Sequence, residues 1–152
     1  MTKYIEKEAV DSNHWILDEF VDLEATPGEI WPWLAQMGNG RAGWYSYDLL
    51  DNLGKKSFEH IDAELVKIQE NQKIPFATIS KVEVNRLLTY RFGSRASMTY
   101  LLEVLSEKRT RLRARLSYLD PSLILRLTLK PAHIFMQNKQ FAELKKRVEK
   151  ST

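Results

Sequence analysis

The chain has 152 residues, of which 43% are hydrophobic and 28% charged, a composition typical of a globular domain with a buried core. It contains no cysteine, which excludes disulfides and thiol catalysis, and its net charge of +3 is too small to indicate a nucleic-acid-binding surface. No apolar run approaches the roughly 20 residues of a membrane helix, and residues 1–14 do not resemble a leader peptide. We therefore expect a cytoplasmic protein that binds no nucleic acid and does not insert stably into membranes.

The first predicted element is a strand at residues 16–25, where apolar and acidic side chains alternate toward its end. A helix follows. Thr26 and Glu29 can form a capping box and Pro27 suits the first helical position, so the helix is expected to run to about Met37. Pro32 predicts a kink or a restarted first turn, and Gly38 is placed to end the helix.

A second short helix is predicted from Ser46 or Tyr47 to Gly54. Strands are then expected at 74–84, 86–92, 97–105 and 110–118, with Pro75 at an edge or at a strand start. In the last strand, apolar residues alternate with Arg111, Arg113 and Arg115, which are predicted to face solvent.

The C-terminal part of the sequence, residues 120–150, predicts helical structure. Asp120 and Pro121 are suited to open one, Pro131 to interrupt or restart it, and residues 132–150 to form the long final helix. Its apolar stripe comprises Ile134, Phe141, Leu144 and Val148. Strands grouped together and helices segregated from them predict an α+β fold, in which the long helix covers the apolar face of a curved antiparallel sheet.

Residues 38–43 (GNGRAG) match the sequence pattern of the dinucleotide-binding motif G-x-G-x-x-G. That motif must follow a strand and open a helix, because the helix amides bind the pyrophosphate. Here the glycines follow a capped helix, and the chain downstream lacks alternating strands and helices. We therefore interpret the segment as a turn between two helices, in which glycine supplies positive φ angles.

Residues 30–54 (IWPWLAQMGNGRAGWYSYDLLDNLG) resemble the start of one branch of the START-like, polyketide-cyclase-like (SRPBCC) superfamily. The resemblance continues at 64–75, although Asn71-Gln72 stands where the family has Gly-Asp, at the strand containing Thr110-Arg111-Leu112 and Arg115, and at 136–149. It implies one START-like domain over 1–152 with the helix-grip fold: a curved sheet around a long C-terminal helix, and two short helices after the first strand.

The same resemblance implies a cavity between sheet and helix that binds a small hydrophobic molecule. Aromatic and methionine side chains suit such a lining, although each could equally fill a core. The candidate ligand-binding residues are Trp31, Met37, Trp44, Tyr45, Tyr47, Phe92, Tyr100, Phe135 and Met136, with Met98 as a further member.

Two alternatives stay open. The first is a cyclase- or dehydratase-like enzyme that uses a cavity acid or base, with Asp48, Glu103, Tyr45 and His60 as candidates. The second is an interaction module, such as a homodimer, whose core is filled by its own side chains. No metal site or cofactor is expected, because His14, His60 and His133 lie in no known ligand spacing.

Overall fold

The computed structural model describes residues 14–151, so most of the segment that argues against a leader peptide, residues 1–13, lies outside the described range. Nearly all the predicted elements are present, with shifted ends. In chain order they are β1 (His14–Leu23), α2 (Pro27–Ala35), α3 (Asp48–Asp51), β2 (Lys73–Ile74), β3 (Ala77–Glu83), β4 (Leu87–Phe92), β5 (Ala96–Ser106), β6 (Arg109–Leu119) and α4 (Leu123–Ser151).

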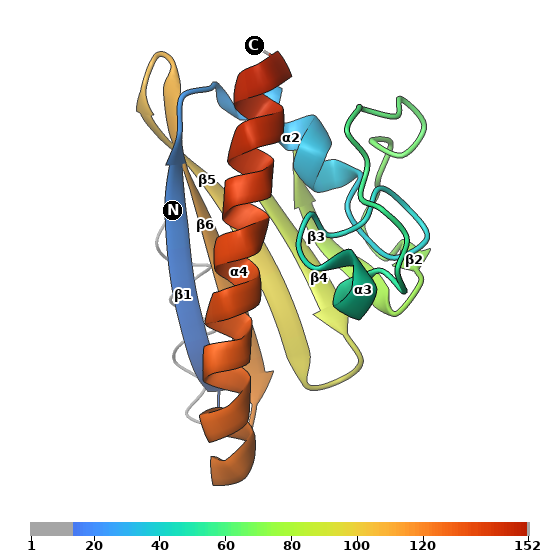
Figure 1. Cartoon of the computed structure of the whole chain (residues 1–152), viewed down its shortest axis with the longest axis vertical. Helices are drawn as coiled ribbons and strands as arrows, with labels where there is room; N and C mark the ends of the chain where they lie inside the picture. Colours follow the sequence, from blue (N-terminus) through green and yellow to red (C-terminus); the bar gives the residue numbers. More distant parts are fainter. Residues whose placement is uncertain (1–13, 152) are drawn as a thin grey trace.

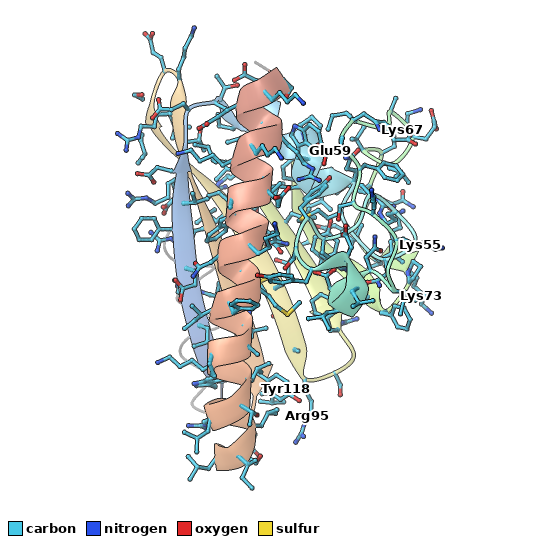
Figure 2. The ribbon with its side chains drawn as sticks, in the orientation of Figure 1. Lys55, Glu59, Lys67, Lys73, Arg95 and Tyr118 are labelled. Atoms are coloured by element: carbon cyan, nitrogen blue, oxygen red, sulfur yellow. The ribbon has the colours of Figure 1, made fainter. Side chains whose placement is uncertain are left out.

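The strands form an antiparallel sheet of six strands in the order β1-β6-β5-β4-β3-β2. Figure 1 shows α4 running along one face of this twisted sheet, with β1 beside it and the short helices α2 and α3 near its other flank. The predicted α+β class, the curved sheet with its long C-terminal helix and the two short helices after the first strand are thereby confirmed.

Helix α2 begins as its sequence predicts. The Glu29 amide donates to the Thr26 hydroxyl at 3.3 Å, and the Glu29 carboxylate accepts from the Thr26 amide at 2.7 Å, which completes the capping box. Pro32 lies inside the helix without ending it. It forfeits one hydrogen bond, and the burial of Ile30 and Leu34 on either side of it holds the helix in place.

The strand predicted over 74–84 is present as β3 at Ala77–Glu83, but its predicted start was wrong, because residues 73–78 form a hairpin. Lys73 pairs with Thr78 and Ile74 with Ala77, which leaves Pro75 and Phe76 as a two-residue turn. Phe76 has a φ of 64°, and a proline followed by a residue with positive φ is the pattern of a type II turn. The Phe76 side chain at this turn is largely exposed.

The prediction that Asp120 opens the last helix and that Pro131 breaks it was also wrong. Asp120 has a φ of 47°, outside helical geometry, and the Ser122 hydroxyl accepts from the Leu125 amide at 3.2 Å, so Ser122 provides the cap. The 29-residue helix α4 then continues through Pro131. Pro131 cannot donate to the carbonyl of Leu127, but that turn is exposed and water can take the place of the lost donor.

The two faces of the sheet differ as the alternation in β6 predicts. Leu112, Ala114 and Leu116 point to the buried face, against which the Phe141, Leu144 and Val148 side chains of α4 pack. The arginines occupy the outer face, as predicted, and pair with acids of the neighbouring strands. These pairs are Arg111 with Asp22 (2.8 Å), Arg113 with Glu103 (3.2 Å) and Arg115 with Asp18 (2.5 Å).

Candidate functional site

The glycine-rich segment after α2 is a closed loop. Gly38 and Gly43 form an isolated antiparallel bridge, with amide-to-carbonyl distances of 3.0 and 3.1 Å. The Ala42 amide donates to the carbonyl of Gln36 and the Arg41 amide to that of Gly38. Because these amides are already bonded within the loop, they are not available to a pyrophosphate, and the geometry is that of a turn between helices.

This loop fixes the position of Trp44. The indole N–H donates to the Asn39 side-chain oxygen at 2.6 Å, and the Asn39 amide donates to the carbonyl of Asp51 at 2.8 Å. The ring meets Tyr90 edge-on at a centroid distance of 5.1 Å and Phe92 at 5.7 Å. The indole is therefore held between the loop and β4, where one side of it borders open space.

That space is a cavity of about 410 Å³ between the sheet, the loop region and the first half of α4. Its lining is mostly aromatic and aliphatic, with polar groups supplied by the loop and by α4. The lining residues are Asn39, Trp44, Ser46, Asp51, Phe76, Phe92, Met98, Tyr100, Leu116, Leu129, Ala132, His133, Met136, Gln137 and Gln140.

Part of the cavity lining is a network of hydrogen bonds centred on Gln140. Its amide donates to the carbonyl of Trp44 at 2.8 Å, and its oxygen accepts from the Tyr100 hydroxyl at 3.0 Å and the Gln137 amide at 2.8 Å. Burial raises the pKa of Tyr100, so its phenol stays protonated and donates. The network connects α4 to β5 and to the loop.

Two titratable side chains, Asp51 and His133, also line the cavity. Burial, reinforced by the negative charge of Asp48, raises the pKa of Asp51 to about 6. Burial lowers the pKa of His133, which favours the neutral imidazole at physiological pH. Asp51 Oδ1 and His133 Nε2 are buried and have no hydrogen-bond partner within the described residues.

The structure separates the predicted ligand-binding residues into two groups. Trp44, Phe92, Tyr100 and Met136 line the cavity together with Met98. The other predicted residues lie elsewhere, and a ligand-binding role for any of the ten stays a prediction. Trp31, Met37 and Tyr45 are buried in the surrounding core, and Tyr47 and Phe135 stack on each other at 4.8 Å.

The four candidate acids and bases lie away from this cavity. Asp48 accepts from the Ser57 hydroxyl at 2.6 Å, and with Tyr45 it lines a separate polar pocket of about 320 Å³. Glu103 is on the outer face of the sheet, and His60 is exposed and stacks on Phe58 at 4.8 Å. The titratable groups at the cavity are instead Asp51, His133 and Tyr100.

The sequence analysis did not identify the polar residues of the lining as part of a site. A usable signal was present on α4, where His133, Gln137, Gln140, Leu144 and Val148 follow one another at spacings of three or four residues. Polar side chains on the stripe that faces the sheet indicate a place where the core is interrupted. Asn39 and Asp51 gave no comparable signal, because the loop geometry alone brings them to the cavity.

Two further features concern only the described part of the chain. No helix within residues 14–151 combines the length and the hydrophobicity that crossing a bilayer requires. In the same range, no three histidine, aspartate or glutamate side chains lie close enough together to hold a metal ion.

No protein-family model matches this sequence, and no curated protein matches it either. Solved structures do match. DynU16, a protein in the dynemicin biosynthetic locus, aligns over 86% of this chain and 47% of its own at 14% identity, with a TM-score of 0.56. This chain thus spans about half the length of DynU16.

Other matches span nearly the whole of both chains. MLL2253 from Mesorhizobium loti is 17% identical over 91% of this chain and 99% of its own, with a TM-score of 0.55. EF2215 from Enterococcus faecalis is 10% identical over 99% and 95%, with a TM-score of 0.53. At such identities the matches show the fold alone, and with the topology above they lead to one conclusion: the chain has the helix-grip fold.

Proposed function

We propose that this protein binds a small, largely apolar molecule in the cavity between the sheet and α4. The observation that carries the proposal is the cavity itself, whose volume of about 410 Å³ and mostly apolar lining suit a ligand of a few rings or a short chain. Methionine and aromatic side chains adapt to irregular apolar shapes, which supports the same assignment.

The geometry of the cavity also supports entry of a ligand from solvent. Phe76 lines the cavity and is 73% exposed, so one wall reaches the surface at the β2–β3 turn. Leu49, Leu50 and Leu53 of the α3 region are also exposed. A large apolar residue in contact with both water and cavity is the feature expected where a ligand passes inward.

The test compares the same substitution at two places on one helix. Ala132 and Ala142 are both exposed residues of α4, but Ala132 lines the cavity and Ala142 does not. Ala132→Trp should fill part of the cavity and Ala142→Trp should leave it open. Native mass spectrometry of protein purified from its own source should then show a bound small molecule in the wild type and in Ala142→Trp, and much less in Ala132→Trp. Equal retention by both variants would contradict the proposal.

A second candidate is an acid–base enzyme of the cyclase or dehydratase type, which Asp51 and His133 favour because titratable groups of shifted pKa line the cavity. Its test is deuterium exchange at the α-carbon of an aromatic β-keto ester, followed by NMR. Wild type should accelerate the exchange, and Asp51→Asn and His133→Gln should not. Exchange at the uncatalysed rate with wild type would exclude this candidate.

A homodimer stays a prediction. The filled-core version of that hypothesis receives no support from a cavity of about 410 Å³. Sedimentation velocity at several protein concentrations tests the dimer itself, and a monomer at all of them would remove it.

A further inference from the structure

Two buried polar atoms at the cavity have no hydrogen-bond partner within residues 14–151: Asp51 Oδ1 and His133 Nε2. They come from different elements, since Asp51 is the last residue of α3 and His133 lies on α4. Among the other groups that line the same space, both side-chain polar atoms of Asn39 and of Gln140 are bonded to protein groups, and so are the Tyr100 hydroxyl and the Gln137 amide nitrogen. The unpaired atoms are therefore particular to these two side chains.

Such atoms are uncommon in folded proteins, because a buried donor or acceptor without a partner loses its hydration and gains nothing in return. In the core, a pairing between neighbours normally removes this penalty. Here both side chains border a cavity that a small molecule can occupy. Whatever fills the cavity, water or a ligand, is therefore placed to supply what the protein does not, and a ligand that displaces water there must make the same hydrogen bonds to avoid a loss of affinity.

Building on the proposed function, we infer that the ligand of this cavity carries a hydroxyl group on an otherwise apolar skeleton, and that Asp51 and His133 bind that hydroxyl. The bond runs from the ligand O–H to the Asp51 carboxyl. His133 Nε2 is complementary to the hydroxyl oxygen when it carries its proton. The aromatic and methionine walls then hold the skeleton.

The state of both side chains near neutral pH fits this role. With a pKa of about 6, the Asp51 carboxyl is mostly ionised at pH 7.5 and acts only as an acceptor. His133 is neutral there and has one ring N–H to give. The terminal torsions of aspartate and histidine are broad, so a modest rotation turns either unpaired atom toward a ligand.

The experiment uses three two-ring probes that differ at one position: 2-naphthol, which donates and accepts a hydrogen bond, 2-methoxynaphthalene, which only accepts, and naphthalene, which does neither. Dissociation constants are measured at pH 7.5 by NMR titration, with the Trp44 indole N–H signal reporting the cavity. We expect 2-naphthol to bind about tenfold more tightly than the other two.

Variants then assign the preference to the two side chains. Asp51→Leu and His133→Leu should each reduce the preference for 2-naphthol to about twofold or less, and both should still bind naphthalene. His60→Leu, the same change at an exposed histidine away from the cavity, should keep the wild-type preference. The comparison of the three probes on wild type stands even if a variant does not fold.

The probe experiment distinguishes failure of the hydroxyl assignment from failure of the proposed function. Equal binding of all three probes by wild type would overturn the hydroxyl assignment and leave apolar binding in place. Equal binding of 2-naphthol and 2-methoxynaphthalene would overturn the role of Asp51 as acceptor. If Asp51→Leu and His133→Leu both kept the wild-type preference for 2-naphthol, the assignment of the hydroxyl to these two side chains would also be refuted. If wild type bound none of the three probes, the proposed function would be contradicted as well.

Discussion

Replacing Gln140 by leucine tests whether the polar network in the cavity lining holds α4 on the sheet. Leucine is close in size and favours helix, so the change removes hydrogen bonds without a gross change in packing. Three groups lose their partner: the Tyr100 hydroxyl, the Gln137 amide and the carbonyl of Trp44.

The expected loss follows from these bonds. Each buried polar group left unpaired costs about 1–3 kcal/mol. Gln137 and Tyr100 border the cavity, so water there can replace part of what they lose. We therefore expect Gln140→Leu to lower the free energy of unfolding by about 2–4 kcal/mol. Tyr100→Phe removes one bond and leaves Gln140 still bonded to Gln137, so its cost should be about 1 kcal/mol.

The assay is urea unfolding followed by tryptophan fluorescence, since the chain has four tryptophans. With a slope of about 2 kcal/mol per M, Gln140→Leu should lower the midpoint by about 1–2 M. In the Tyr100→Phe background the same change should cost about 1 kcal/mol less, because the hydroxyl it would leave unpaired is already gone. Strict additivity, or a Gln140→Leu midpoint equal to wild type, would refute the reasoning.

Three more predictions concern stability. Leu144→Ala should cost about 2–5 kcal/mol in urea unfolding, and Leu127→Ala on the same helix less than about 0.5 kcal/mol, because Leu144 is fully buried and Leu127 is 69% exposed; equal costs would contradict the packing. Gly43→Ala should lower Tm much more than Gly93→Ala: both residues have positive φ, but a Cβ at Gly43 overlaps a serine hydroxyl and one at Gly93 meets nothing within 4 Å. Asp51→Asn should be as stable as wild type near pH 4 and more stable above pH 6, because the folded pKa of about 6 lies above the ordinary 3.8, so ionisation on raising the pH destabilises the wild-type fold; an unchanged difference between pH 4 and 8 would count against a buried carboxyl.

Much of the fold could be predicted from local signals. The capping box of Thr26 and Glu29 sets the start of α2, and alternation in β6 decides which face is buried, because both depend on residues close together in the sequence. The errors arose where local rules compete. Pro75 and Phe76 lie inside a run that reads as strand, and only the pairing of Ile74 with Ala77 makes them a turn.

The site was less predictable than the fold. Aromatic side chains are as common in a solid core as around a cavity, so the sequence could not separate Trp44 and Tyr100 from Trp31. Asp51 and His133 are 82 positions apart in the chain, and their meeting at one cavity depends on how α3 and α4 pack. The packing of α3 against the rest of the fold brings the two side chains to one cavity, and the spacing of residues in the sequence does not indicate it.

The uneven burial of α4 has a mechanical consequence. Its second half is anchored by Phe141, Leu144 and Val148, whereas the turns around Leu123 and Leu127 are largely exposed. Pro131 lies between these halves, and because proline has no backbone N–H, one hydrogen bond of the helix is absent there. Bending the first half of α4 away from the sheet therefore breaks few contacts of the exposed turns, while the second half stays packed through its buried side chains. We therefore expect the first half of α4 to move relative to the sheet more easily than the second half, which packs in the core.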